Sequence, residues 1–157
     1  MKSVGKRELR VDARSKVTGK AIYPQDIYMD GMLYGKTLRS SEPHAYIEVD
    51  KSKAEKIDGV VKIFTAEDVT GENYHGVLFK DHEVFCEKKV RRVGDPIAFA
   101  VAESPDIAEA AVNAIEIKYE KLEGVFDPEE AMKEDAPEVH DGQSNTVYHY
   151  KIRKGDV

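Results

Sequence analysis

Cysteine is almost absent from this chain of 157 residues, since Cys86 is the single one. One cysteine excludes a disulfide within the chain, and such scarcity is typical of proteins from a reducing compartment. Long apolar runs are also missing, and none approaches the roughly 20 residues that a membrane-spanning helix needs. The N-terminal stretch MKSVGKRELRVDARSKVTG is basic but lacks the apolar core of a secretory signal. We therefore expect a cytoplasmic protein that does not contact the membrane.

The chain also lacks an excess of positive charge. It contains 24 lysines and arginines against 30 aspartates and glutamates, which gives a net charge of −6. A general nucleic-acid-binding protein needs a basic surface, so this balance argues against that class. Apolar residues make up 41% of the chain, which is enough for one hydrophobic core.

The clearest pattern lies between Val90 and Leu122. The apolar run Pro96–Ala102 predicts a strand that is covered on both faces. Ser104 and Pro105 are typical of a helix start, and residues 115–122 alternate between apolar and polar as a half-exposed strand does. This segment contains no evident catalytic group, so its pattern indicates scaffold.

Shorter elements are predicted on either side of that segment. Strands are expected over residues 32–38, 45–49 and 60–64, with a short helix that begins after Asp50 and ends at Gly59. A short strand is expected near 83–85, a helical turn over 127–132, and a strand without a later partner over 147–152. The pattern predicts an α+β fold, β-β-α-β followed by β-α-β, around a mixed sheet.

The same pass divides the chain into three parts. Residues 1–18 are polar and are expected to form an extended arm, and residues 19–133 carry the regular elements. From residue 134 to residue 157 the pattern dissolves into turn-forming residues. We expect this last part to be a linker that leads to a further domain.

Three local motifs have simpler explanations than a chemical role. Gly35-Lys36-Thr37 is similar to the end of a phosphate-binding loop, but position 30, where that loop needs a glycine, is Asp30. The acidic residues after Phe126 (Asp127, Glu129 and Glu130) could serve acid–base chemistry, although a helix start explains them as well. The pair Arg91-Arg92 is expected at an exposed strand start.

The irregular stretch 65–89 contains the residues with the most chemical potential. His75, His82 and Cys86 are metal-ligand types, but their spacing matches no standard site, so we predict no bound metal. Cys86 is either a nucleophile beside a histidine or a small apolar filler. Leu78 and Phe79 form an apolar pair in a polar loop, which either packs on the core or faces something outside.

Four groups of segments along the chain match a known pattern. They are Val17–Ala21 with Tyr23 and Asp26, Gly31–Lys36 with Leu38–Ser40 and Pro43–Ala45, Gly59-Val60 with Thr65–Val69, and Val90–Ala98 with Ile117–Leu122. Each matching segment is weak alone, but their order along the chain is specific. Together they resemble the N-terminal α/β hammerhead domain of the molybdenum-binding subunit of xanthine dehydrogenases and aldehyde oxidases. The departure is Ser41, where relatives often have proline.

The resemblance implies a function that depends on other parts of a larger enzyme. Such subunits hydroxylate carbon centres at a molybdenum–pterin cofactor, and electrons leave through 2Fe-2S clusters and often FAD on partner chains or domains. The cofactor contacts and the catalytic base lie in later domains, so this chain alone is expected to be inert. Gly155-Asp156-Val157 resembles the opening of the next domain.

One segment is expected to reach the substrate. Residues 78–81, before Glu83-Val84-Phe85, resemble a stretch whose Leu-Phe pair lines the substrate funnel of xanthine dehydrogenases. The resemblance thus assigns Leu78 and Phe79 to the substrate channel and assigns no catalytic, cofactor-binding or metal residue. The alternatives are a stand-alone, non-catalytic binding or assembly module, or a small metal enzyme that uses His75, His82 and Cys86.

Overall fold

The computed structural model describes residues 4–77 and 79–155, which form two compact units. The first unit ends at Met32 and contains α1 (Ala13–Val17) and the 3-10 helix η1 (Pro24–Asp26). Asp12 pairs with Arg10 and Lys16 at the start of α1, at 3.0 and 2.7 Å. The expected arm over residues 1–18 is thus not extended throughout, because these ion pairs accompany one turn of helix. The compact units divide after residue 32, and the domain boundary expected after residue 18 stays a prediction.

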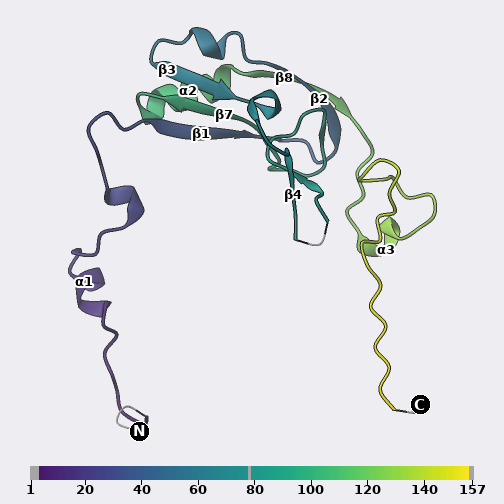
Figure 1. Cartoon of the computed structure of the whole chain (residues 1–157), viewed down its shortest axis with the longest axis horizontal. Helices are drawn as coiled ribbons and strands as arrows, with labels where there is room; N and C mark the ends of the chain where they lie inside the picture. The colour runs from purple at the N-terminus through teal and green to yellow at the C-terminus, as the bar shows by residue number, and fades with distance from the viewer. Residues whose placement is uncertain (1–3, 78, 156–157) are drawn as a thin grey trace. The chain divides into compact units, whose positions relative to one another are not determined.

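The second unit, from Leu33 onward, contains two small sheets and a ribbon (Figure 1). The first sheet has the order β1 (Tyr34–Arg39), β7 (Pro96–Ala102), β3 (Val60–Phe64). The second has the order β6 (Lys89–Val90), β2 (Ala45–Asp50), β8 (Glu116–Lys121). The ribbon consists of β4 (Tyr74–His75) and β5 (His82–Glu83).

The fold class is confirmed, but the expected single mixed sheet is wrong in detail. Every strand pair in the described residues is antiparallel, and the strands divide between separate sheets. The strands at 34–39, 45–50, 60–64, 96–102 and 116–121 agree with the predictions to within two residues. The expected helix after Asp50 is shorter than predicted: it is the 3-10 helix η2 (Ala54–Lys56). Residues 147–152 form no strand, and they are mostly exposed.

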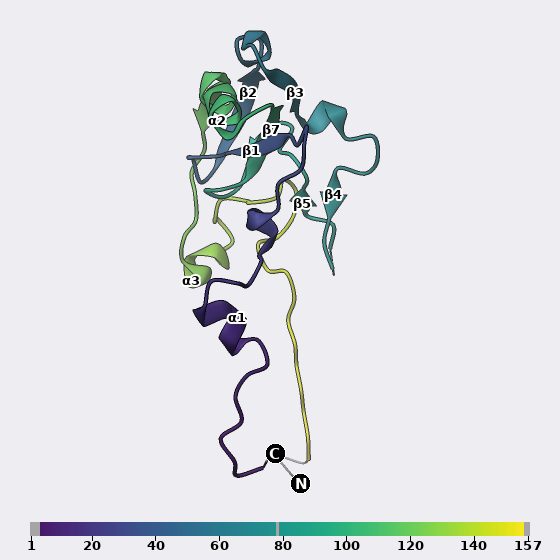
Figure 2. The same ribbon diagram turned by 90° about the vertical axis from the view of Figure 1, so that its left-hand side faces the viewer.

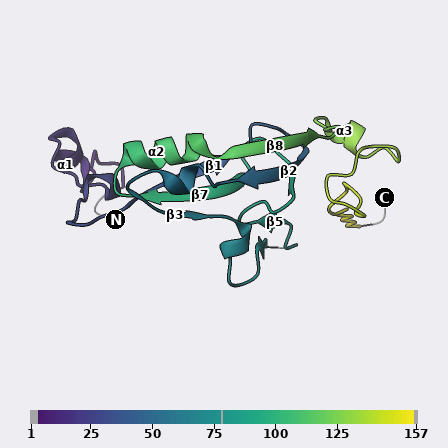
Figure 3. The same cartoon turned by 90° about the horizontal axis from the view of Figure 1, so that it is seen from above.

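Helix α2 (Pro105–Ala114) lies against β1 and β7 of the first sheet, as Figures 2 and 3 show. It begins as predicted, since the Ser104 hydroxyl accepts from the amide of Ile107 at 3.2 Å. Its inward face is made of small residues, which bring the helix close to the sheet. The buried core at this contact includes Ile63, Ala98, Ala100, Ala111 and Val112.

Gly35 belongs to this packing and not to a phosphate-binding loop. It lies within β1, where a Cβ atom would meet the ring of Phe99 at 2.1 Å. Only glycine leaves room for that ring across the strand. The structure thus favours the simpler explanation of Gly35-Lys36-Thr37.

Candidate functional site

The ribbon β4–β5 carries the candidate site, and hydrogen bonds from polar side chains hold its two strands together. The Asn73 side-chain amide donates to the Phe85 carbonyl at 2.9 Å, and its oxygen accepts from the Phe85 amide at 3.2 Å. The Tyr74 hydroxyl donates to Glu83 at 3.0 Å, an interaction that raises the pKa of Tyr74. These bonds hold a short two-stranded ribbon that has little apolar burial of its own.

The tip of the ribbon carries Phe79, one of the two predicted channel residues. Its partner in that prediction, Leu78, lies outside the described residues. Gly76 allows the tip to close, because a Cβ atom there would come within 1.6 Å of the Phe79 carbonyl oxygen. The Phe79 side chain is 53% exposed and lines a groove of about 750 Å³. The other apolar walls of the groove include Val125, Phe126, Val139 and Val147.

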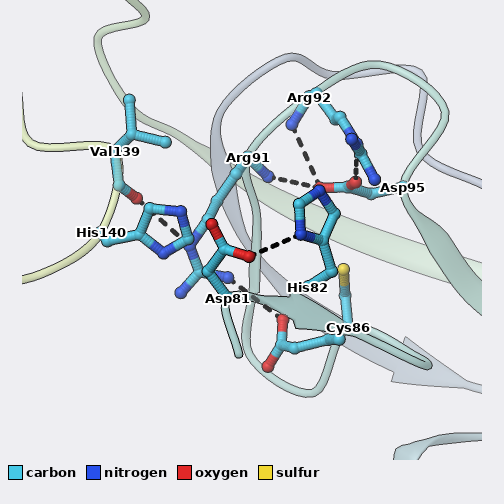
Figure 4. Close-up of a pocket in the computed structure, with 9 residues that line it drawn as sticks. Asp81, His82, Cys86, Arg91, Arg92, Asp95, Val139 and His140 are labelled. Carbon is cyan, nitrogen blue, oxygen red and sulfur yellow. Dashed lines mark hydrogen bonds and ion pairs between the residues drawn. The ribbon is translucent and has the colours of Figure 1, made fainter. Parts of the chain in front are cut away.

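Below the ribbon, Arg91 connects three segments of the chain (Figure 4). Its guanidinium donates to Glu83 on β5 at 3.1 Å and to the Val139 carbonyl at 3.2 Å. The side chains of this ion pair are 19% and 6% exposed, so the pair is largely shielded from water. Removing one partner of such a pair leaves an uncompensated buried charge.

Asp95 fixes the turn from which Arg91 projects. It is 7% exposed, and its carboxylate accepts from the backbone amides of Arg91 and Arg92 at 2.8 and 3.1 Å. It also accepts from the side chain of Arg92 at 2.7 Å. The expected strand start is wrong for both arginines, which follow the end of β6 at Val90 and precede β7. The Arg91 side chain is engaged beside the ribbon, whereas that of Arg92 is 60% exposed.

The expected linker also contributes to this region. Asp141 pairs with the nearly buried amine of Lys89 at 2.6 Å, which lowers the pKa of Asp141. Asn145 donates to the carbonyls of Ala131 and Pro137 at 3.2 and 2.9 Å. Residues 137–145, which we call the strap, thus lie against the region around Arg91 and do not run free from it.

The three metal-ligand types do not converge. His75 and His82 stack across the ribbon with ring centroids 5.7 Å apart. His82 bonds Asp81 at 2.6 Å, which lowers the pKa of Asp81. Cys86 is 5% exposed, and burial raises its pKa to about 12, so it stays a thiol at neutral pH. In residues 4–77 and 79–155, no group of three or more His, Cys, Asp or Glu side chains could hold a metal ion.

The acidic residues after Phe126 act at a helix start. The Asp127 carboxylate accepts from the amides of Glu129 and Glu130 at 2.9 and 3.0 Å, at the N-terminus of α3 (Pro128–Ala131). This geometry supports the capping explanation for Asp127.

Comparison with known proteins identifies the fold. A family model described as "Aldehyde oxidase and xanthine dehydrogenase, a/b hammerhead domain" matches residues 18–123. The chain belongs to this family. The resemblance noted in the sequence is thereby confirmed, and the described part of residues 18–123 is a hammerhead domain with the antiparallel sheets given above.

Two relatives illustrate the range of the family. The chain is 44% identical to a probable xanthine dehydrogenase subunit of Bacillus subtilis, over 95% of this chain and 20% of that protein. It is 41% identical to the nicotinate dehydrogenase large molybdopterin subunit of Eubacterium barkeri, over 98% of this chain and 36% of that protein. The hammerhead chain thus spans about a fifth to a third of the length of these relatives.

Solved structures agree with the assignment. The aldehyde oxidoreductase of Desulfovibrio gigas matches with a TM-score of 0.82 and 31% identity, over 88% of this chain and 17% of that chain. The carbon monoxide dehydrogenase of Oligotropha carboxidovorans matches with a TM-score of 0.78 and 36% identity, over 85% and 17%. No helix of the described residues is both long and apolar enough to cross a membrane.

Several residues that organise the hammerhead site were not found by sequence reasoning. Arg91, Asn73 and Asn145 act through carbonyl and carboxylate partners up to 48 residues away in the chain. Asn73 offered a local signal, because it lies in the loop between Gly71 and Gly76, where asparagine often bonds the backbone. Arg91 and Asn145 offered none, since no local motif encodes the bond of Arg91 to Val139 or those of Asn145 to Ala131 and Pro137.

Proposed function

We propose that this chain is the hammerhead part of the large subunit of a molybdenum hydroxylase, and that Leu78 and Phe79 line its substrate funnel. The observation that carries the proposal is Phe79, an aromatic side chain that is 53% exposed on a braced ribbon and borders an apolar groove. A large apolar side chain kept half exposed at such a position is suited to contact a bound molecule. The family and the names of the relatives support the enzyme class.

The molybdenum–pterin cofactor would supply the oxidation chemistry from elsewhere in that subunit. The residues described here do not fit the group, because their potential ligands do not converge and Cys86 stays a buried thiol at neutral pH. We infer that the chain alone is catalytically inert. Its partners would be the remaining domains of its subunit, beyond residues 134–157, and chains or domains that carry 2Fe-2S clusters and FAD.

The role of Phe79 is tested in the complete enzyme by steady-state kinetics. We expect Phe79→Ala to raise KM about tenfold with kcat nearly unchanged, since the wall would contribute to binding and not to the chemical step. Val77→Ala is the matched control, because Val77 lies on the same ribbon and is fully exposed. Unchanged kinetics for Phe79→Ala with aromatic heterocycles, purines and aldehydes as substrates would count against the funnel role.

The assignment to a larger enzyme is tested separately on the 157-residue chain. Purified protein should contain no stoichiometric molybdenum, zinc or iron and should show no hydroxylase activity. Stoichiometric metal that is lost in a His75→Ala, His82→Ala double variant would support the alternative that the chain is a small metal enzyme. If the chain is a stand-alone binding module instead, it should not associate with 2Fe-2S or FAD chains in co-purification.

A further inference from the structure

The strap, residues 137–145, forms one wall of the Phe79 groove. Phe79 comes from the ribbon, whereas Phe126 precedes α3. The strap residues that line the groove are Val139, His140, Gln143, Ser144 and Asn145. The shape of the groove therefore depends on where the strap lies.

Two cationic side chains fix the strap on either side of His140. The Arg91 guanidinium donates to the Val139 carbonyl at 3.2 Å, and the Lys89 amine pairs with Asp141 at 2.6 Å. The side chains of Arg91 and Lys89 are 19% and 5% exposed, so water screens their charges poorly. Because Val139 and Asp141 are the chain neighbours of His140, the imidazole is held within the field of both cations.

The His140 side chain is half-buried and lines a polar cavity of about 140 Å³ (Figure 4). Arg91, Asp81 and His82 line the same cavity. Burial lowers the pKa of His140 from its ordinary value of 6.5, and the charge of Arg91 lowers it further. Asp81 acts in the opposite sense but does not outweigh them, and His82 and Lys89 add to the lowering. The neutral imidazole is thus the form that suits the closed strap.

The carboxylates that line this cavity, and Asp141 on the strap, already have partners. The pairs are Asp81–His82 at 2.6 Å, Glu83–Arg91 at 3.1 Å, Asp95–Arg92 at 2.7 Å and Asp141–Lys89 at 2.6 Å. A proton on His140 would therefore add a positive charge beside Arg91 and Lys89, and none of these carboxylates is free to neutralise it.

We propose that the strap is a pH-sensitive latch, which protonation of His140 loosens from Arg91 so that one wall of the Phe79 groove opens. In the closed strap the pKa of His140 is lowered, so its contribution favours closure above 6.5 and is lost as pH falls below 6.5. The pair of Asp141 with Lys89 stays charged, because Lys89 lowers the pKa of Asp141 from 3.8, and it keeps the loosened strap tethered. The latch does not depend on the role proposed for Phe79, because it concerns only the shape of the groove.

Amide hydrogen exchange of the 157-residue chain at pH 8 and pH 5.5 tests the latch. The amides of Val139 and Gln143 report on the strap, since they bond the Asn145 side chain and the His140 carbonyl, each at 3.0 Å. We expect their protection factors to fall about threefold to tenfold at pH 5.5, while those of β7 stay unchanged. Unchanged or higher protection in the strap would overturn the proposal, as would an equal loss in β7, which indicates global unfolding.

Two variants assign the pH dependence to His140. His140→Gln keeps a polar side chain that gains no proton, so the strap should be equally protected at both pH values. His75→Gln is the matched control, because His75 is an exposed histidine on β4 that does not line the cavity, and it should keep the full pH dependence. A pH dependence that persists in His140→Gln, or that is lost in His75→Gln, would contradict the assignment.

An NMR pH titration of the His140 ring in the parent chain gives a readout that needs no substitution. The proton on Cε1 should titrate with a midpoint below 6.5, because the closed strap disfavours the imidazolium. A midpoint at or above 6.5 would overturn the proposal, since protonation would then stabilise the closed strap or leave it unchanged.

Discussion

The sheet beneath α2 and the ribbon β4–β5 are stabilised in different ways. The sheet buries small and branched apolar side chains, among them Ile63, Ala100 and Ala111, at 1% exposure or less. The ribbon buries little apolar surface and is held by Asn73, by Tyr74 and by the Arg91–Glu83 ion pair. The comparison teaches that the scaffold is stabilised by the hydrophobic effect, whereas the candidate site depends on a few directional contacts.

The largest effect is expected in the core of the sheet. Ile63→Ala should lower the free energy of unfolding by about 2–5 kcal/mol, because it opens a cavity in a fully packed site. Val61→Ala on the same strand is the control, since Val61 is 54% exposed, and it should change the free energy by less than about 0.5 kcal/mol. Urea denaturation measures both. Similar losses for the two variants would contradict the role assigned to the core.

The next effect is expected at the ribbon. Arg91→Met leaves the Glu83 carboxylate, 6% exposed, without its charged partner and bonded only to the Tyr74 hydroxyl, and it should destabilise the ribbon by about 3 kcal/mol. Hydrogen exchange should accelerate at the amides of Val84 and Phe85, which bond Asn73, and stay slow in β7. Lys118→Met is the control, because its ion pair with Glu48 has both side chains exposed, at 77% and 76%. Equal acceleration in β7 and in the ribbon would show that the two regions unfold as one unit.

Two helix caps extend the comparison from the sheet to α3, which lies outside the ribbon, and involve smaller free energies. Ser104→Ala should cost about 1 kcal/mol of global stability, because α2 packs on the sheet. Asp127→Ala removes the cap of α3, which has no buried residue, and should increase exchange at the amides of Glu129 and Glu130 without changing the urea midpoint. A fall in global stability for Asp127→Ala as large as that for Ser104→Ala would contradict the expectation that the α3 cap affects only local opening.

The smallest effect concerns charge at the edge of the sheet. Lys62 and the Thr65 amide bond Asp68 and lower its pKa from 3.8 to about 2. A lowered pKa favours the folded state above the unfolded value, and this contribution is lost as pH falls from 3.8 towards about 2. Asp68→Asn should therefore flatten the acid dependence of the urea midpoint in that range. Parallel pH profiles for the variant and the parent chain would contradict this.

The difference between the regions also decides what the sequence could predict. Apolar periodicity and the Ser104-Pro105 start predicted β7, α2 and β8, because local pattern and burial agree there. The strap was expected to be a linker, since turn-forming residues do not reveal its contacts. Asp141 bonds Lys89, 52 residues away, and Asn145 bonds carbonyls that no periodic pattern points to. The expected strand at 147–152 has no partner in the described chain, and alternation alone does not make a strand.

The candidate site was predicted only at its tip. Phe79 was assigned through a family resemblance, and its half-exposed position at the groove agrees with that expectation but does not test it. The Arg91 contacts with Glu83 and Val139 depend on tertiary geometry that no spacing in the sequence encodes. The environment of His140 has the same origin, because burial and neighbouring charges are properties of the folded chain.

The most direct test of the account is a double-mutant cycle on KM in the complete enzyme, with Phe79→Ala, Arg91→Met and the two combined. If Arg91 acts by holding the ribbon that presents Phe79, each single variant should raise KM, and the double variant should raise it no more than the stronger single variant. Additive effects on KM, or an unchanged KM in Arg91→Met, would contradict the claim that this ion pair positions the substrate wall.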